Sequence, residues 1–550
     1  MIIDFKKLQN TQNIKCDICI VGAGAAGSIL FDKLTDSKFN VVLLESGLVD
    51  VEDDYQELNK GEILLQGQNN KNKNEVIDYV NFRLRGLGGT TNHWGGGCSP
   101  FHEIDFLKRD WIKKSGWPIK LNDLNPYYKK ANMYFELSTD VWDEKIWNDI
   151  GLQSNLLNLN EDKVKTLLRY RSGFLKKSIS KAIRDWSAVN FKKYLLSSKS
   201  KNSENRIIYD ATLTKLISEN NKFIDYGVVK SLNGIEKKIF AKKFILCSGG
   251  YEVARILLNS GKNNGLANDN DLVGRYYLGH PNTTDFMKLI CNTKEIASKL
   301  IWNFGWHKIG ENQSMPHLGF KKKFQEEHYL LNTGIWFGGH EDKNHPIYIA
   351  KQLRRDLLNK NFKNINLSTK EFLSILKNID EILLNIKRGY TNPRGVKNPV
   401  KEEVDIFYMA EQVPNKDSRI YLSKEKDMLG MNKIVLDWHL TEMDRENPLK
   451  IAKHLASTFG EANVGKIVLD DNLQEKINNF ENFGDTGHPS GTTRMSDSKD
   501  DGVVNKNLKS HFVDNLYVCS SSVFPTSSYT SPTYSIGALA IRLAEHLIEI

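Results

Sequence analysis

Cysteine is scarce in this chain, with six residues among 550. The first two have the CxxC spacing of redox and zinc sites, but they lie in an apolar run that predicts a strand. Residues three apart in a strand face opposite sides. The set is also too scattered for a disulfide framework: Cys16, Cys19, Cys98, Cys247, Cys291 and Cys519. We therefore expect structural cysteines, and the histidine spacings match no familiar metal pattern, so no metal centre is expected.

Long apolar runs are also missing. No uninterrupted stretch approaches the roughly eighteen apolar residues of a transmembrane helix. The N-terminal sequence MIIDFKKLQNTQNIKCD lacks the apolar core of a signal peptide. We therefore expect a cytoplasmic protein with no transmembrane segment. With 40% hydrophobic and 26% charged residues the chain resembles soluble globular proteins, and its length predicts two domains or one large elaborated fold.

Basic blocks interleaved with aromatic residues are missing too, although the net charge is +9. Lysine is spread through segments such as NNKNKNE and KNNGLANDND, and no nucleic-acid-binding motif is recognisable. We therefore expect no nucleic-acid partner. A general bias toward lysine explains most of the charge, and a minor preference for anionic substrates is the other interpretation.

Glycine, by contrast, occurs at spacings that indicate a particular structure. The segment CDICIVGAGAAGSILFDKLTDSKFNVVLLESG predicts a strand over residues 18–21, a GxGxxG turn, a helix, and a second strand over residues 41–44. In such a turn the first glycine permits the bend, the second lets a pyrophosphate approach the backbone, and the third lets helix and strand pack closely. These glycines are Gly22, Gly24 and Gly27. The order of elements predicts a dinucleotide-binding unit.

The residue that follows the second predicted strand narrows the choice of cofactor. Glu45 lies 23 residues after Gly22, where a carboxylate accepts hydrogen bonds from ribose hydroxyls. An acid there argues against a 2′-phosphate, so FAD and NAD both remain open on this pattern.

A second strand-to-glycine pattern occurs far along the chain, in KKIFAKKFILCSGGYEVARILLNSG. It predicts a nucleotide domain that is discontinuous in sequence. We expect residues 1–284 and 481–550 to form the FAD-binding domain and residues 285–480 a substrate-binding domain. The last of these contains the alternating run HYLLNTGIWFGG and a charged stretch, 368–390, that predicts a helix.

Several ordered motifs together resemble the glucose–methanol–choline (GMC) family of FAD oxidoreductases. They include GGTTNHWGG, RDWIKKSGWPI, LVGRYYLGHP, VPNKDSRIYLS and GHPSGTTRM. GGTTNHWGG and SGWP are most similar to the sugar-oxidising branch, which includes fructose and gluconate dehydrogenase flavoprotein subunits and pyranose oxidase. The resemblance implies FAD rather than NAD. It also implies an α/β fold (α+β overall), with a discontinuous Rossmann-like domain and a sheet-containing substrate domain.

The resemblance also implies a set of FAD contacts beyond the three glycines and Glu45. They lie in the turn after the first strand, just after the second strand, in and directly before the glycine-rich loop, in the middle of the nucleotide domain and near the C-terminus. The set is Ala25, Ala26, Ser46, Arg85, Gly88, Gly89, Thr90, Asn92, His93, Trp94, Gly95, Leu213, Ser522, Pro532 and Thr533.

His93 stands inside the glycine-rich loop GLGGTTNHWGGGCSP. In pyranose oxidase a similar THW histidine is bonded covalently to the flavin C8 methyl group, and His93 occupies the corresponding place. The resemblance leaves two interpretations open, a covalent bond and a packing or hydrogen-bonding contact at the flavin edge.

Two residues near the C-terminus are the catalytic candidates. His488 in GHPSGTTRM matches the family's active-site histidine, and a histidine suits a base that must work near neutral pH. The family's NPT motif reads SPT here, which puts Ser531 at the second catalytic position. Serine before proline also predicts an N-cap for the final helix, in addition to a substrate contact.

These motifs predict an FAD-dependent oxidoreductase that removes a hydride from a hydroxyl-bearing carbon of a sugar, polyol or sugar derivative. A dehydrogenase is expected rather than an oxidase, and the electron acceptor stays open. The alternatives are the flavoprotein subunit of a membrane-associated sugar dehydrogenase complex and, because of Ser531, a non-redox or degenerate flavoprotein acting as a lyase or isomerase.

Overall fold

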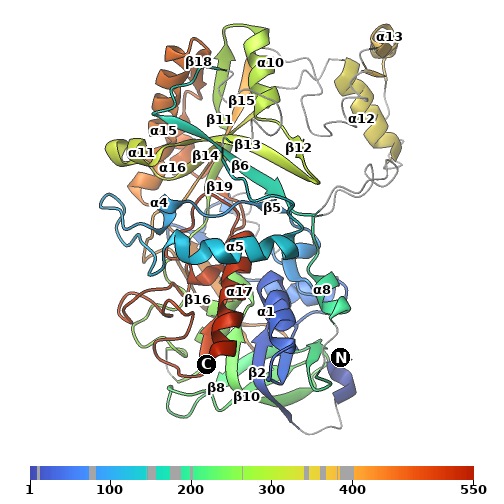
Figure 1. Cartoon of the computed structure of the whole chain (residues 1–550), viewed down its shortest axis with the longest axis vertical. Coiled ribbons are helices and arrows are strands. Elements are labelled where there is room, and N and C mark those ends of the chain that lie inside the picture. Colours follow the sequence, from blue (N-terminus) through green and yellow to red (C-terminus); the bar gives the residue numbers. More distant parts are fainter. Residues whose placement is uncertain are drawn as a thin grey trace.

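The structure is a computed structural model of the whole chain. It describes residues 1–8, 13–73, 82–143, 145, 157–173, 188–198, 202–262, 264–339, 346–358, 367–380, 382, 383 and 402–550. The predicted α/β class is confirmed, because helices pack against several sheets of both parallel and antiparallel strands (Figure 1).

The first sheet contains strands from both ends of the sequence. Its order is β1(Ile2–Asp4), β7(Arg206–Tyr209), β3(Val41–Leu44), β2(Ile14–Val21), β10(Glu236–Leu246), β9(Tyr226–Lys230) and β8(Thr212–Ile217), with β20(Leu516–Val518) also on β10. The strands β1, β7, β3, β2 and β10 pair in parallel along this order, and β20 is parallel to β10. The pairs of β10 with β9 and of β9 with β8 are antiparallel. The predicted strands at residues 18–21 and 41–44 are therefore neighbours, with Val21 opposite Leu44.

Helices cover this sheet because their apolar faces are buried on it. α1(Ala25–Thr35) follows the glycine turn, and nine of its residues are buried. α17(Thr533–Glu549) packs against both α1 and α5(Leu121–Phe135), so the C-terminal helix lies beside the first helix of the nucleotide unit (Figure 1). α9(Gly249–Leu258) follows β10, which matches the second predicted strand–glycine–helix pattern.

The second sheet is antiparallel and forms the other half of the molecule (Figure 1). Its order is β18(Gly465–Leu469), β11(Pro281–Cys291), β15(Glu403–Ala410), β14(Thr333–Gly339), β13(Asn312–Phe320), β6(Val164–Arg171) and β5(Gly97–Cys98), with β12(His307–Ile309) on β13 and β19(Gly484–Asp485) on β11. The alternating run HYLLNTGIWFGG supplies β14. β5 and β6 come from sequence before residue 284, so this sheet is also assembled from separate segments, and the three-part domain division stays a prediction.

A small third sheet joins β4(Glu62–Leu65) to the hairpin β16(Arg419–Lys426) and β17(Asn432–Trp438). The larger helices outside the first sheet are α10(Lys294–Asn303), α12(Pro346–Leu358), α13(Thr369–Lys377) and α15(Glu442–Glu461). Short helical pieces are η1(Phe5–Leu8), α2(Asp53–Gln56), η2(Glu57–Asn59), η3(Gly89–Asn92), α4(Glu103–Phe106), α8(Lys192–Ser197), α11(Lys322–His328), α16(Leu473–Asn478) and η5(Ser521–Val523).

Two sequence expectations bear on the outer parts of the fold. The helix expected over residues 368–390 is found as α13, and the C-terminal part of that range, from residue 384, lies outside the described residues. In the part of the chain that the structure describes, no helix combines the length and apolar character needed to cross a bilayer.

Candidate active site

A cavity of about 630 Å³ opens at the carboxyl ends of the parallel strands. Val21, Leu44 and Cys247 line it, and each stands at or directly after the end of β2, β3 or β10. The cavity extends from the glycine turn to the start of α17, where Pro532 and Thr533 line it. Ligands of open α/β sheets bind at this edge of the strands.

The glycine turn has the form that a pyrophosphate site needs. Gly22 has φ +102°, a conformation that favours glycine, and a Cβ on Gly27 would meet the carbonyl oxygen of Gly22. A Cβ on Gly24 would meet no atom within 4 Å, although Gly24 lines the cavity. Gly24 is also the N-cap of α1 and provides no side-chain cap, so a ligand can take the N–H groups of the first turn.

Glu45 ties three loops together at the cavity wall. Its carboxylate accepts hydrogen bonds from the backbone N–H groups of Ala23 (2.9 Å), Gly47 (2.8 Å) and Gly86 (3.0 Å). Burial raises the pKa of Glu45, and these N–H groups oppose the shift. The carboxylate therefore fixes the glycine turn against the glycine-rich loop, and it lines the cavity where a ribose is predicted.

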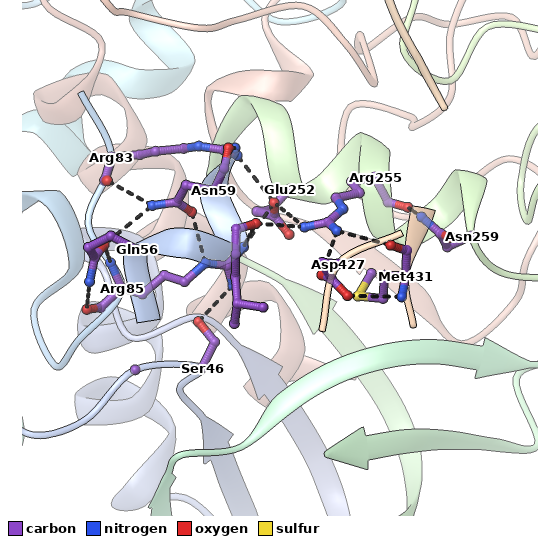
Figure 2. A network of polar contacts seen from close by, with 12 residues as sticks. Ser46, Gln56, Asn59, Arg83, Arg85, Glu252, Arg255, Asn259, Asp427 and Met431 are labelled. Carbon is purple, nitrogen blue, oxygen red and sulfur yellow. Dashed lines mark hydrogen bonds and ion pairs between the residues drawn. The ribbon is translucent and has the colours of Figure 1, made fainter. Parts of the chain in front are cut away.

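A buried charge network supports the same end of the cavity (Figure 2). Arg83 (3.2 Å), Arg85 (3.0 Å) and Arg255 (3.3 Å) all contact the same oxygen, Oε1, of Glu252. Burial disfavours the Glu252 carboxylate, but the guanidinium groups of Arg85, Arg255 and Arg83 outweigh it and lower the pKa to about 2.

The network also orients the cofactor candidates Arg85 and Ser46. Arg85 donates to the Ser46 hydroxyl (3.0 Å) and to the Asn59 amide oxygen (2.8 Å). On the far side, Arg255 pairs with Asp427 (2.6 Å) in the turn between β16 and β17. The first and third sheets are thereby linked directly behind the cavity.

The glycine-rich loop is held by its own amide side chain. Asn92 donates to the carbonyl oxygens of Leu87 (3.0 Å) and Gly89 (2.7 Å), and Trp94 donates to the carbonyl of Val189 (2.8 Å). His93, between these anchors, is exposed and lines the cavity. Partial burial lowers the pKa of the His93 imidazole, which favours the neutral ring.

His488 lines the other end of the cavity and faces a second histidine. Its Nδ1 atom lies 3.0 Å from the Thr486 hydroxyl and 3.2 Å from Nδ1 of His280. Burial, His280 and Arg169 lower the pKa of His488 well below its ordinary value, and burial lowers that of His280 to about 3. Both imidazoles are therefore neutral at neutral pH.

The backbone of His280 is held by a buried carboxyl group. Asp485 accepts a hydrogen bond from the His280 backbone N–H (2.8 Å) and another from the Tyr277 hydroxyl (2.9 Å). Burial raises the pKa of Asp485 to about 6, although these hydrogen bonds oppose the shift. The Tyr277 hydroxyl also lies 2.9 Å from that of Tyr251, which lines the cavity.

A second, small cavity of about 10 Å³ adjoins the large one, and Gly97, Arg169 and Ser531 line both. Three of its other lining residues, His317, Trp336 and Met409, come from the second sheet. The His317 ring stacks on Trp336 with 4.7 Å between ring centroids. The Arg169 guanidinium, the Ser531 hydroxyl and these aromatic rings therefore lie where the large cavity adjoins the antiparallel sheet.

Ser531 does not cap the final helix, so the predicted N-cap is wrong. The N-cap of α17 is Pro532, and no side-chain hydrogen bond caps the helix. The Ser531 side chain instead lines the two cavities. The physical reason is that the helix begins one residue later than the SPT pattern predicts, with the Ile536 N–H donating to the Pro532 carbonyl (2.9 Å).

Most of the predicted site residues line the large cavity together. Four of the predicted cofactor contacts are not among its lining residues: Gly27, Gly88, Asn92 and Ser522. Gly27 and Asn92 support the turn and the loop, as described above, and Ser522 bonds the Thr493 hydroxyl (2.6 Å). Direct contact with FAD stays a prediction for every residue of the set, these four included.

Several residues of the site are not among those predicted from the sequence. His280 lies inside the LVGRYYLGHP motif and Glu252 follows the second glycine pattern, so both could have been predicted from those motifs. Arg169 stands in the ordinary strand pattern TLLRYR and carries no local signal. Its place beside Ser531 depends on pairing between distant strands.

The residues present fit FAD. The open space beside Gly24 suits a pyrophosphate, and the Ser248 hydroxyl lines the cavity without a hydrogen-bond partner among the described residues. The free N-terminus of α17 offers a positive dipole end to the other end of a long ligand. The fold and this cavity together define a dinucleotide-binding protein in which Gly97 and Arg169 of the second sheet complete the cavity wall.

Comparison with known proteins agrees with this class. Residues 414–540 match the family model described as GMC oxidoreductase. The chain is 20% identical to 2-methyl-1,2-propanediol dehydrogenase of Mycolicibacterium austroafricanum, over 96% of this chain and 95% of that one. It is also 20% identical to the fructose dehydrogenase large subunit of Gluconobacter japonicus, over 98% and 99%.

Solved structures share the fold over nearly the whole length. Pyridoxine 4-oxidase from Mesorbium loti has a TM-score of 0.57 at 15% identity, with 97% of this chain and 99% of that chain covered. Formate oxidase has a TM-score of 0.53 at 15% identity, with 98% and 99% covered. The predicted resemblance to the GMC oxidoreductases is confirmed, and this similarity indicates FAD as the cofactor and oxidation of an alcohol-type substrate.

Proposed function

We propose that this protein is a dehydrogenase that oxidises a hydroxyl group of a sugar, polyol or sugar derivative, with FAD held in the large cavity. The observation that carries the proposal is the cavity itself, which joins a pyrophosphate-type glycine turn at one end to His488 and Ser531 at the other. Two full-length relatives are named for a diol and for fructose, which supports a polyhydroxylated substrate.

Bound FAD supplies an acceptor for the hydride that leaves the hydroxyl-bearing carbon. His488 accepts the hydroxyl proton, because a neutral imidazole with a low pKa has a free lone pair at neutral pH. Thr486 and His280 both lie next to Nδ1 of His488, so a proton on Nδ1 has an acceptor and Nε2 is left for the substrate. His280 acts as a positioning residue that fixes this tautomer.

Arg169 and Ser531 complete the substrate end. The Arg169 guanidinium lies against the backbone of Gly97 and faces the junction of the two cavities, where it stabilises negative charge on the reacting oxygen. The Ser531 hydroxyl, which is not used in capping, hydrogen-bonds the substrate oxygen. His93 is the candidate for a covalent bond to the flavin, because it is exposed toward the cavity on an anchored loop.

The second candidate is the flavoprotein subunit of a larger dehydrogenase complex. It is favoured by the full-length similarity to a protein named as a large subunit. Purification of the tagged chain from its native cells, followed by gel filtration, distinguishes the two: a lone enzyme elutes without a bound redox partner.

The test of the main proposal is an anaerobic substrate panel. Matched series of polyols, sugars and diols are mixed with the purified protein, and the visible flavin band is followed. We expect at least one hydroxyl compound to bleach the band in a single turnover. A flavin that no member reduces, but that dithionite reduces normally, would contradict the proposal and favour a non-redox flavoprotein.

A further inference from the structure

α12 and α13 form an arm that stands at the outer edge of the second domain (Figure 1). The two helices pack on each other, and α13 has no buried residue. Five large apolar side chains of α13 and the residues that follow it are 47–60% exposed. We call them the arm stripe: Phe372, Leu373, Leu376, Ile379 and Leu383.

The arm stripe has helical spacing. Phe372 and Leu376 are four residues apart on α13, which places them on one side of that helix, and Ile379 and Leu383 repeat the spacing just after its C-cap, Asn378. The exposed residues Lys370 and Lys377 lie on the same helix. An amphipathic helix on a globular protein normally buries its apolar face. An apolar face that is exposed therefore indicates a surface that binds a partner or a membrane.

The charge of the sequence segment that contains the arm indicates what covers it. Residues 346–401, part of which lies outside the described residues, contain twelve Lys and Arg against four Asp and Glu, whereas the rest of the chain contains 64 against 63. The net charge of +9 is therefore almost entirely local to this segment. An apolar helix face together with local excess lysine and arginine is the composition of helices that lie in the interface of anionic membranes.

We propose that the arm docks on an anionic lipid bilayer, with the arm stripe inserted at the boundary between headgroups and acyl chains and the basic residues of α12 and α13 against lipid phosphates. The apolar side chains supply the insertion, and the charge selects anionic over zwitterionic lipid. The surface is separate from the large cavity, so this inference does not depend on the proposed reaction.

The test is co-sedimentation of the full-length FAD-loaded protein with lipid vesicles. Phosphatidylcholine vesicles are compared with vesicles that also contain phosphatidylglycerol. We expect binding only to the anionic vesicles, and weaker binding as salt is raised. The triple variant F372S/L376S/I379S should lose about tenfold or more of the partition coefficient, because it removes three inserted side chains.

Two controls keep the result specific. The variant M428S/V468S removes exposed apolar side chains elsewhere (65% and 49% exposed) and should bind like the wild type. The variant K370E/K377E should lose the preference for anionic lipid. Wild-type protein that stays in the supernatant with both vesicle types would overturn the proposal, as would equal binding by the triple variant. Sedimentation velocity without lipid gives the other decisive result, since an oligomer that the triple variant dissociates would make the arm a contact between copies of the chain.

Discussion

At the scale of single residues, the proposed chemistry depends on an imidazole that is neutral when substrate arrives. Replacing His488 by Ala should slow flavin reduction by about 10²- to 10⁴-fold, the usual contribution of a positioned base. FAD content should stay unchanged, because the loss of the ring leaves the glycine turn intact. Stopped-flow reduction with a substrate found in the panel measures the rate.

The matched control is His511→Ala. His511 lies in the same C-terminal part of the chain, contacts the Ser496 carbonyl (3.1 Å) and does not line the large cavity. It should leave the reduction rate unchanged. If His488→Ala reduces its flavin at the wild-type rate, His488 is not the base, whatever the control shows.

His93 permits a second test at this scale. If it is bonded to the flavin, acid precipitation of the wild type should leave the yellow colour in the pellet, because a covalent bond survives unfolding. His93→Ala should release the colour to the supernatant, and His511→Ala should not. Absorbance of both fractions decides the question, and free flavin from the wild type would reduce His93 to a packing contact.

At the scale of elements, the turn from β2 into α1 makes a sharp prediction. Gly24→Val places a side chain where the pyrophosphate is expected, but in space that the protein itself leaves open. The variant should fold and lose about nine-tenths or more of its FAD. Gly460→Val is the control, because a Cβ at Gly460 of α15 also meets nothing within 4 Å and lies outside the cavity. The ratio of flavin to protein absorbance, with circular dichroism for folding, is the measurement, and stoichiometric FAD in Gly24→Val would remove this turn from the site.

The start of α17 gives the second prediction on elements. Because Ser531 does not cap this helix, Ser531→Ala should change the free energy of unfolding by less than about 0.5 kcal/mol. Thr441→Ala should cost about 0.5–2 kcal/mol, since the Thr441 hydroxyl accepts from the Asp444 N–H (3.3 Å) at the start of α15. Urea unfolding compares the two. The same Ser531→Ala protein should reduce its flavin more slowly, and a normal rate would mean that the hydroxyl does not touch substrate.

How far the sequence predicts this molecule depends on the range of the interactions concerned. The glycine turn, the strand directly before Glu45 and the helix that begins at residue 369 are local patterns, and the structure contains all three. The cap at Ser531 was also a local inference, and a one-residue shift of the helix start made it wrong. Arg169 reaches the site through β6, which pairs with the distant strand β13, so no local pattern indicates its position.

At the scale of the whole molecule, the Glu252 network holds the first and third sheets together behind the cavity. Glu252→Gln removes the charge that three guanidinium groups share, and it should lower the free energy of unfolding by about 3–5 kcal/mol, as expected when one partner of a buried ion pair is lost.

Since folding lowers the pKa of Glu252 from 4.5 to about 2, the carboxylate contributes stability that is complete above pH 4.5. That contribution is lost as the pH falls toward 2. The difference in unfolding free energy between wild type and Glu252→Gln should therefore be constant from neutral pH to about pH 5 and shrink at about pH 3.5. Urea titrations at these pH values measure it, with Glu425→Gln, an exposed partner of Lys433, as the control that should change little at any of them. A difference that stays constant through the acid range would show that the Glu252 charge does not stabilise the junction of the sheets.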